Sequence, residues 1–569
     1  MNFTDKANFI WSVADLLRGD FKQSEYGKVI LPFTVLRRFD CVLAPSKEKI
    51  LEMNKTLTVS NKKPVFKRFT GHDYYNISRF DFAKLLDDSN AIETNLRDYI
   101  NGFSDDVKEI LDNFELGVVI ERLKKANLLY LIIQKFSEID LTADTVDNLE
   151  MGYMFEELIR RFSEQSNETA GEHFTPREVI ELMVELLLDP DMDEMTQDGI
   201  VKTIYDPACG TGGMLSVAQN KLKAINAKTT VIPFGQELNP ETYATCKSDM
   251  ILKGNTNSKI VLGNSFSEDG FYGQAFDYML SNPPFGVEWK KVEKFIKDES
   301  ERQGYSGRFG AGTPRISDGS LLFLQHMISK MTPPNKGGSR IGIVFNGSPL
   351  FTGDAGSGES EIRKWIIEND MLEAIIALPD QLFYNTGIST YIWILTNRKS
   401  SRRVGKIRLV NGISYFEKMR KSLGNKRNLI SEQNRRDIVN LYSMYEPDEN
   451  YIDFDNEDFG YRKITVERPM RDENGDIITD KKGGKKADTA LRDTENVPLK
   501  ADIRVYFKRE VLPHVPDAWI EETKTKSGYE IPFTRHFYKF TPLRPSEEIM
   551  DEIKALEEKI AKGLAEVLG

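Results

Sequence analysis

A short polar run after an apolar segment carries the strongest chemical signal in this sequence. Residues 281–285 read Ser-Asn-Pro-Pro-Phe and follow the apolar stretch 276–280, which is typical of a buried strand. Prolines fix the backbone direction and remove amide donors, so an amide side chain and a backbone carbonyl can point at one spot beside the ring. Two such acceptors and a flat ring suit a planar base that carries an amino group, although Asn-Pro also opens ordinary turns. The catalytic residues predicted from this run are Asn282, Pro283, Pro284 and Phe285.

A glycine-rich turn is the second candidate site. An expected strand at 201–206 leads into Asp-Pro-Ala-Cys-Gly-Thr-Gly-Gly at 206–213, where a helix begins. Glycines at such a turn let the backbone approach a ligand, and the start of the helix offers free amide donors. The spacing differs from the dinucleotide fingerprint, and an aspartate at the strand end suits an ammonium group, such as that of S-adenosylmethionine, instead of a pyrophosphate. A structural tight turn is the alternative; the residues assigned to the ligand are Asp206, Gly210, Thr211, Gly212 and Gly213.

Two later strand ends extend this predicted cofactor site. Glu237 ends the next expected strand, a position at which an acid commonly holds ribose hydroxyls. Asn264 and Ser265 follow the third strand, where a short amide could bond an adenine and Phe266 could flank its ring. Gly-Asn-Ser is also ordinary turn chemistry, so the assignment of this pair depends on its position after the strand.

The segment 173–178, His-Phe-Thr-Pro-Arg-Glu, stands at the start of an expected helix. We predict Thr175 as its N-cap, Pro176 at its first position and Glu178 as the acid of a capping box. Phe174, Thr175 and Pro176 could also close over a ligand at the helix start. We therefore include all three among the predicted cofactor-binding residues.

The segment 286–317, directly after the Asn-Pro-Pro-Phe run, is expected to be a long loop. Its cations could contact phosphates, and a solvated surface loop is an equally open alternative. Asp318, at the end of this segment, is expected to cap the next helix. The cations concerned are Lys290, Lys291, Arg302, Arg308 and Arg315.

Composition limits the class of protein. The 569 residues, 40 % of them hydrophobic, suffice for a globular chain of about three or four domains. The net charge of −11 argues against a free-standing nonspecific nucleic-acid binder, but it allows a local basic groove or a partner that supplies DNA contacts. There is no phosphate-loop motif, zinc spacing, membrane-length apolar run or signal-peptide pattern. With only three scattered cysteines, a reducing, cytoplasmic setting is expected.

The strand and helix patterns predict an α/β protein with flanking regions. Between 166 and 400, strands alternate with amphipathic helices, which predicts a doubly wound, mostly parallel sheet as the catalytic domain. Residues 1–165 are expected to be all-helical. Residues 401–545 should form a helical C-terminal extension with a mobile loop or hairpin near 471–498, and 546–569 a helix for a coiled-coil partner or for packing on its own body. The predicted strands are 201–206, 231–236, 259–262, 276–281, 340–345, 372–378 and 390–396.

The order of these motifs resembles that of amino-group DNA methyltransferases, and in particular the modification (M) subunit of type I restriction-modification systems. The Phe-Thr-Pro element precedes the glycine turn, and Asn-Pro-Pro-Phe comes later. Residues 171–176, 280–286 and 531–538 are similar to those of type I M subunits, as are the helical N-terminus and the terminal helix. The resemblance covers nearly the whole chain. Asn264 departs from it, because many methyltransferases have an acid there.

The resemblance implies an activity, a cofactor and partners. The methyl donor would be S-adenosylmethionine, and the product would be adenine methylated on its exocyclic amino group in duplex DNA. Two M subunits would bind one specificity (S) subunit, which reads the target, and a motor-nuclease (R) subunit would add cleavage. The alternatives are a methyltransferase for a protein amide or an RNA base, and a non-catalytic interaction subunit.

Overall fold

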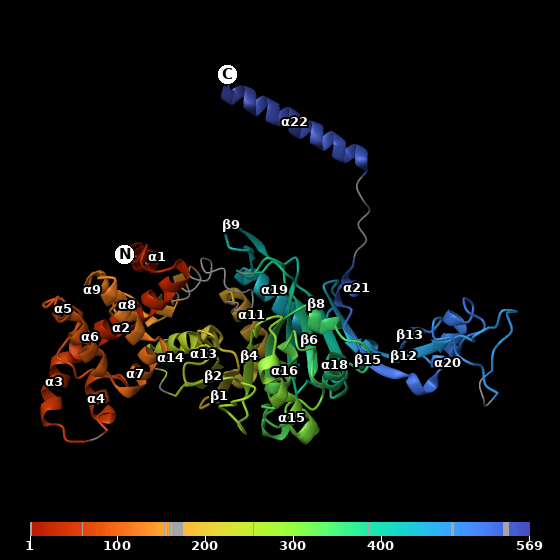
Figure 1. Ribbon diagram of the computed structural model, residues 1–569, viewed down its shortest axis with the longest axis horizontal. Coiled ribbons are helices and arrows are strands. Elements are labelled where there is room, and N and C mark those ends of the chain that lie inside the picture. Colours follow the sequence, from red (N-terminus) through yellow and green to blue (C-terminus); the bar gives the residue numbers. More distant parts are fainter. Residues whose placement is uncertain are drawn as a thin grey trace. The chain divides into compact units, whose positions relative to one another are not determined.

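The structure is a computed structural model in which two compact units, Met1–Ile531 and Pro532–Gly569, are distinguished. Figure 1 shows the helices and strands of the chain. The residues described are 3–59, 61–148, 150–152, 154–155, 157–158, 161, 175–253, 255, 257–384, 386–479, 483–538 and 545–568.

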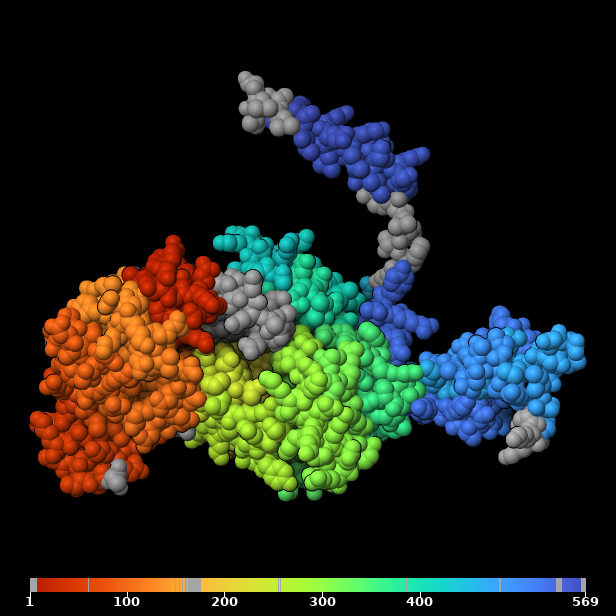
Figure 2. All heavy atoms as spheres, viewed as in Figure 1, coloured from red at the N-terminus to blue at the C-terminus, as the bar shows by residue number. Residues whose placement is uncertain are grey.

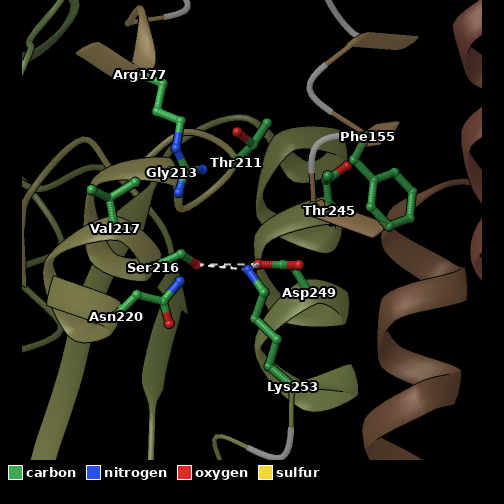
Figure 3. Close-up of a pocket in the computed structure, with 11 residues that line it drawn as sticks. Phe155, Arg177, Thr211, Gly213, Ser216, Val217, Asn220, Thr245, Asp249 and Lys253 are labelled. Carbon is green, nitrogen blue, oxygen red and sulfur yellow. Dashed lines mark hydrogen bonds and ion pairs between the residues drawn. The ribbon is translucent and has the colours of Figure 1, made fainter. Parts of the chain in front are cut away.

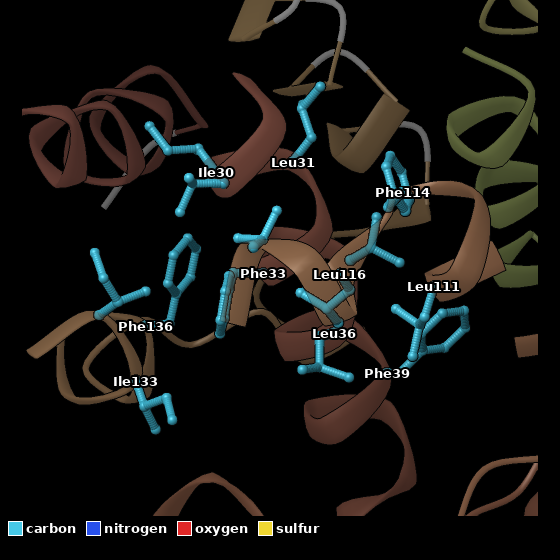
Figure 4. Close-up of a cluster of buried hydrophobic side chains, with 14 of the residues drawn as sticks. Ile30, Leu31, Phe33, Leu36, Phe39, Leu111, Phe114, Leu116, Ile133 and Phe136 are labelled. Atoms are coloured by element: carbon cyan, nitrogen blue, oxygen red, sulfur yellow. The ribbon is translucent and has the colours of Figure 1, made fainter. Parts of the chain in front are cut away.

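The N-terminal part of the first unit is helical, as predicted, and folds around one apolar core (Figure 4). Its central helix α2 is apolar on nearly all sides and is therefore surrounded by the others. The rings of Phe33 in α2 and Phe136 in α9 stack with centroids 5.7 Å apart. The helices are α1 (Phe3–Leu17), α2 (Tyr26–Leu43), α3 (Lys47–Thr56), α4 (Lys63–Thr70), α5 (Phe82–Leu85), α6 (Ile92–Asn101), α7 (Asp105–Asn113), α8 (Leu116–Lys125) and α9 (Leu129–Ser137).

A nine-stranded sheet forms the centre of the first unit, in the order β11-β8-β6-β7-β5-β4-β1-β2-β3. The strands run parallel except β7, which is antiparallel to β5 and β6, and β11, which is antiparallel to β8. The predicted doubly wound, mostly parallel sheet is thus confirmed. Its strands are β1 (Val201–Asp206), β2 (Thr230–Glu237), β3 (Lys259–Leu262), β4 (Tyr278–Ser281), β5 (Arg340–Asn346), β6 (Leu372–Ala377), β7 (Thr390–Thr396), β8 (Lys406–Asn411) and β11 (Tyr451–Asp455).

Helices pack on both faces of this sheet because alternate strand residues point to opposite faces. Ile204 in β1 joins the apolar cluster with α11 (Arg177–Leu188), α13 (Gly213–Ile225) and α19 (Glu432–Ser443), whereas its neighbour Tyr205 meets α16 (Ser320–Ile328). α14 (Pro240–Leu252) follows β2. Its N-cap Asn239 accepts from the amides of Glu241 and Thr242. Shorter helices are α12 (Met192–Met195), α15 (Glu293–Gln303), α17 (Ser348–Phe351) and α18 (Gly358–Glu368).

The sheet does not end at residue 400, because β8 and β11 extend it. The expected helical C-terminal extension also contains two further sheets. One is the hairpin of β9 (Glu417–Leu423) and β10 (Lys426–Leu429). The other consists of β12 (Gly460–Glu467), β13 (Asp493–Pro498), β14 (Trp519–Ile520) and β15 (Lys526–Tyr529), with the short helix α20 (Ile503–Tyr506) beside it in the chain. The strands here are short and strongly charged, so apolar periodicity did not reveal them.

The second unit contains α21 (Phe533–Phe537) and the terminal helix α22 (Ser546–Leu568), so the predicted helix from Ser546 is confirmed. Its apolar residues at the predicted spacing are all exposed: Ile549, Ile553, Leu556 and Ile560. Among the described residues, no helix has the length and apolarity needed to cross a membrane.

Candidate active site

The chain reverses its winding between β1 and β4. From β1 it adds β2 and β3 on one side and then returns to place β4 on the other side. Open parallel sheets bind ligands at such a reversal, in the crevice beyond the carboxyl ends of the strands. Tyr205 pairs with Met279 across β1 and β4, so Asp206 and Asn282 follow neighbouring strand ends. The fold thereby brings together the glycine turn and the Asn-Pro-Pro-Phe run.

Asp206 is the last residue of β1, at this edge of the sheet, and is only 2 % exposed. Its Oδ1 accepts hydrogen bonds from the Ala208 amide and the Ser281 hydroxyl, each at 3.0 Å. Burial, with a contribution from the charge of Glu237, raises the pKa of Asp206 to about 7, although both hydrogen bonds oppose the shift. A carboxylate that ionises so reluctantly would gain most from a cation beside it, such as the ammonium group that the sequence suggested.

The glycine turn leads from β1 into α13. Gly210 and Gly212 have φ of +53° and +83°, a region that side chains rarely adopt. A Cβ on Gly212 would meet the Cys246 sulfur at 2.6 Å, so this glycine is required by packing as well as by conformation. At Gly210, by contrast, no described residue other than its two chain neighbours comes within 4 Å of the added carbon. The backbone at Gly210 is therefore open to a ligand, and Thr211 and Gly213 continue the turn into the helix.

Glu237 stands at the end of β2 and supports the same turn. Its Oε2 accepts from the Gly210 amide at 2.8 Å, and its Oε1 accepts from the Asn239 amide at 2.8 Å. These bonds fix the carboxylate beside the turn. The acid predicted to hold ribose hydroxyls therefore lies next to the glycine turn.

Asn264 and Ser265 follow β3 and make mainly local contacts. The Asn264 Oδ1 accepts from the amides of Phe266 and Ser267 at 2.9 and 3.3 Å. The Ser265 hydroxyl donates to the carbonyl of Pro207, next to Asp206. Phe266 is buried among Phe309 and Phe323. Ser265 thus ties this loop to the glycine turn, and the oxygen of Asn264 is occupied by its own turn.

Asn282 has one satisfied and one unsatisfied end. Its Nδ2 donates to the Thr175 hydroxyl at 2.9 Å. Its Oδ1 is buried and has no hydrogen-bond partner in the part of the chain that the structure describes. An unpaired buried acceptor costs about 1–3 kcal/mol, so its persistence at a strand end indicates a group that is satisfied by a ligand.

The rest of the Asn-Pro-Pro-Phe run is packed into the protein. Phe285 is 9 % exposed, and its ring meets that of Phe383 edge-on with centroids 6.5 Å apart. Pro283 is buried and Pro284 is partly exposed. The prolines lock the direction in which the chain leaves β4, and the anchored ring holds the turn in place.

The start of α11 differs from the prediction. The helix begins at Arg177 with Pro176 as its N-cap residue, and no side chain caps it. Thr175 accepts from Asn282 instead, and Glu178 forms an ion pair with Lys426 instead of closing a capping box. The side chains of Thr175 and Glu178 therefore contact residues that are distant in the sequence and do not cap the helix. Phe174, like His173, lies outside the described residues.

The segment 286–317 is not a loop, because it contains the 11-residue helix α15. Arg308 points inward and cannot serve a phosphate: its guanidinium donates to Glu299 at 2.6 Å and to the carbonyls of Ser265 and Phe266. Lys290, Lys291, Arg302 and Arg315 are exposed. Asp318 does act near the next helix, where its Oδ1 accepts from the Ser320 amide at 3.1 Å, although Gly319 is the N-cap residue.

A pocket also lies beside the start of α13, between Arg177, Thr211 and Lys253 (Figure 3). The Lys253 amino group donates hydrogen bonds to Asp249 and to the Ser216 hydroxyl. These three polar groups of the pocket therefore already satisfy one another. The pocket shares Thr211 and Gly213 with the glycine turn but includes neither Asp206, Glu237 nor Asn282. We therefore place the chemistry at the strand ends and not in this pocket.

Sequence reasoning missed three residues of the site. Ser281 bonds Asp206, Lys426 pairs with Glu178, and Phe383 anchors Phe285. Ser281 could have been found from the expected pairing of the first and fourth strands. Lys426 and Phe383 gave no such signal, because only the tertiary fold brings them to the crevice.

Comparisons with known proteins bear on this site. Residues 147–460 match the family model for N-6 DNA Methylase, and residues 6–136 match that for the HsdM N-terminal domain. The first match contains every strand of the nine-stranded sheet. The second contains most of the helical N-terminal domain.

The chain is also similar to individual methylase subunits of type I restriction enzymes. The chain is 26 % identical to the type I restriction enzyme MjaIX methylase subunit of Methanocaldococcus jannaschii, over 88 % of this chain and 86 % of that protein. It is 28 % identical to the HindI methylase subunit of Haemophilus influenzae, over 58 % of this chain and 68 % of that one. A solved type I restriction-modification methyltransferase subunit of Streptococcus thermophilus shares the fold, with a TM-score of 0.63, 22 % identity and coverage of 80 % and 96 %.

Proposed function

Because this chain belongs to the N-6 DNA methylase family, we propose that Asn282 and Pro283 hold the adenine amino group while it is methylated. The chain is an adenine-specific DNA methyltransferase (EC 2.1.1.72) that resembles the methylase subunits of type I restriction enzymes, as its sequence predicted. The residues that carry the reaction are our assignment. It depends on one observation, the buried and unsatisfied Oδ1 of Asn282.

An amino group on an aromatic ring is a weak nucleophile because its lone pair is shared with the ring. The Oδ1 of Asn282 and the carbonyl of Pro283 would each accept one amino hydrogen. As the nitrogen attacks, its positive charge grows, so two fixed acceptors bind the transition state more tightly than the ground state. The hydrogen bond from Asn282 to Thr175 fixes which end of the amide faces the base. No covalent intermediate is required.

The adenine must leave the duplex to reach this crevice, at a cost of a few kcal/mol. Phe285 was predicted to stack on the extruded base. The Phe285 ring packs edge-on against Phe383 and is largely buried. We therefore propose that only a small part of the ring contacts the base and that the ring also fixes the turn. Pro284, which is partly exposed, borders the same turn.

The same strand ends would hold S-adenosylmethionine, which supplies an electrophilic methyl group when bound. Asp206 would accept the ammonium group, whose charge would favour the ionised carboxylate. The open backbone at Gly210 and the turn through Thr211, Gly212 and Gly213 would lie against the amino-acid portion. Glu237 would accept hydrogen bonds from the ribose hydroxyls. The oxygen of Asn264 is occupied by its own turn, so only its amide NH₂ group could donate to an adenine. Ser265 would hold the loop against the glycine turn. Phe174, Thr175 and Pro176 would cover the bound cofactor.

Partners follow from the same family. We propose that two copies of this chain bind one specificity (S) subunit in the cytoplasm, and that a motor-nuclease (R) subunit joins them on duplex DNA. The exposed apolar residues of α22 give a seam for a coiled-coil partner. The net charge of −11 agrees with a chain that leaves much of the DNA contact to others.

The test measures transfer of tritiated methyl groups by the assembled methylase to DNA from a host that lacks this system. Asn282→Asp should abolish most transfer, because a carboxylate has no amide hydrogen to donate to Thr175, so the hydrogen bond that orients the side chain is lost. Asn346→Asp is the matched control, since Asn346 ends the neighbouring strand β5 and its Oδ1 only accepts from the Ser348 amide. Equal rates for both variants and the native chain would refute the assignment.

The two alternatives have their own readouts. Transfer to RNA or protein, with none to unmethylated duplex DNA, would favour a different acceptor. Failure to bind S-adenosylmethionine in calorimetry would favour a non-catalytic interaction subunit. The acceptors of Asn282 and Pro283 suit any planar amino or amide group, so only the measured acceptor separates these cases.

A further inference from the structure

The hairpin of β9 and β10 is a basic element on an acidic chain. It carries the cations Lys418, Arg420, Lys421, Lys426 and Arg427, against the single carboxylate of Glu417. Lys418, Arg420, Lys421 and Arg427 are exposed, and none of these four side chains takes part in an ion pair or hydrogen bond within the described part of the chain. Some exposed cations of the sheet region, such as Lys228, Lys297 and Arg436, pair with a carboxylate, whereas these four lie together on one short hairpin without such a partner among the described residues.

The strand β9 projects from the body. Figure 1 shows β9 beyond the helices that cover the sheet, and Figure 2 shows the same teal segment standing out on the surface. The pairing is irregular: Lys426 lies opposite Leu423, but Asn428 lies opposite Lys418, so β9 bulges between these pairs. Arg420 and Lys421 are in this bulge. A bulge re-aims side chains and blocks pairing with another strand, which suits a contact made by side chains.

The turn end of the hairpin, residues 424–427, is fixed to the body. The buried amino group of Lys426 pairs with Glu178 and donates to the Leu382 carbonyl. The amides of Asn425 and Arg427 donate to the carbonyls of Tyr384 and Gln381 at 2.8 and 2.9 Å. The exposed cations are therefore held at a defined place, unlike those on a free loop.

That place is next to the catalytic turn. Glu178 is in the first turn of α11, and Thr175, which stands just before the N-cap residue Pro176, accepts a hydrogen bond from Asn282. From the other side, Phe383 in the segment that supports the hairpin holds Phe285. The turn end of the hairpin and the Asn-Pro-Pro-Phe turn thus contact the same two segments, the start of α11 and residues 381–384.

From these contacts we propose that the β9–β10 hairpin grips the phosphates of the duplex beside the adenine that enters the crevice. The inference rests on the proposed function. Duplex DNA is a dense array of negative charge, and phosphate contacts position a protein on it without reading sequence. An enzyme that extrudes a base needs the neighbouring backbone held while the base is out of the stack. Lysine and arginine side chains on a rigid element near the crevice meet that need.

The test compares DNA binding by the full chain assembled with its S subunit. Lys418→Gln, Arg420→Gln and Lys421→Gln are combined in one variant. The matched control combines Lys55→Gln, Lys223→Gln and Lys508→Gln, which are also exposed and lie away from the hairpin. Fluorescence anisotropy with a duplex of arbitrary sequence, at several salt concentrations, gives the affinity and its salt slope.

We expect the hairpin variant to lose at least about tenfold in affinity at 0.1 M salt, and its slope to fall by about two to three, since each phosphate contact contributes about 0.9. The control should differ from the native protein by much less. S-adenosylmethionine binding should be unchanged, which also shows that the fold is intact. Lys418→Arg with Lys421→Arg should keep the native slope, because the charges remain.

Two results would overturn the inference. An unchanged affinity and slope, with normal methylation by the native complex, would show that the hairpin does not touch DNA. Loss of the S subunit from the hairpin variant, with unchanged DNA binding by what remains, would show that it docks a protein instead. If the native complex methylates no duplex, the proposed function fails first and this inference fails with it.

Discussion

Two polar clusters on the same sheet have opposite character. Around Arg308, the guanidinium bonds Glu299, two carbonyls and one nitrogen of His326, whose other nitrogen is 2.9 Å from the Tyr205 hydroxyl. Burial lowers the pKa of His326 well below its usual range, so the ring stays neutral between these partners. At the strand ends, Asn282 keeps an unpaired buried oxygen, and burial raises the pKa of Asp206 to about 7.

The difference separates structural from functional polar groups. Buried polar atoms are nearly always paired, so a cluster whose members satisfy one another serves stability. A cluster that leaves an acceptor and a reluctant carboxylate facing one crevice has been left incomplete for a ligand. Both sites contain charged residues near a strand end, and only the hydrogen-bond inventory tells them apart.

The largest effect expected is on stability, from Arg308→Met. The change leaves the Glu299 carboxylate and two carbonyls without their donor, so unfolding free energy should fall by about 3–5 kcal/mol. Urea unfolding followed by circular dichroism measures it. Arg302→Met is the control, because Arg302 is exposed and lies 3.9 Å from Asp298, a pair worth less than about 1 kcal/mol. Equal losses of unfolding free energy in the two variants would contradict a structural role for Arg308.

The next effect is on catalysis, from Asn282→Ala. Removing one fixed acceptor of the developing charge should slow methyl transfer by about 10²–10³-fold. Unfolding free energy should change little, because the variant also removes an unsatisfied buried oxygen. Single-turnover transfer and urea unfolding are measured on the same preparation. A large loss of stability with a proportionate loss of rate would place Asn282 in the structural class with Arg308.

Asp206→Asn tests the reluctant carboxylate through pH. The folded-state pKa of Asp206 lies above its unfolded value, so its contribution to stability is full below pH 4 and is lost as pH rises through about 7. Between pH 5.5 and 7 the native protein should therefore lose about 2 kcal/mol relative to the asparagine variant. Unfolding of both proteins across this range measures the difference. Parallel curves would contradict the raised pKa.

The smallest effect expected is from Ser281→Ala. It removes one hydrogen bond to Asp206 and should cost about 1 kcal/mol at pH 8, where the carboxylate is charged. The loss should shrink at pH 5.5, where Asp206 is protonated. Ser422→Ala, on the exposed surface of β9, is the control and should change stability by less than about 0.5 kcal/mol. If Ser281→Ala lowered the unfolding free energy equally at both pH values, the hydrogen bond from Ser281 would not depend on the charge of Asp206.

Much of the site was readable before the fold was known. Strands 201–206, 259–262 and 390–396 have the predicted bounds, and the Asn-Pro-Pro-Phe and glycine turns follow strands as expected. These elements are coded by local patterns of apolar residues and by prolines and glycines, which act through neighbouring residues only. The same local rules misplaced Thr175 and Glu178, because their partners Asn282 and Lys426 are distant in the chain.

The amino-acid sequence by itself determined the chemistry available here: which strand ends carry an acid, an amide or a glycine turn, and in what order. The tertiary structure decided which of these meet, because the reversal between β1 and β4 sets Asp206 and Asn282 on adjacent strands. It also decided which cations are free, turning Arg308 inward and leaving Lys418, Arg420 and Lys421 outside. The physical reason is that local patterns fix conformation, whereas hydrogen-bond partners and burial depend on residues brought together from afar.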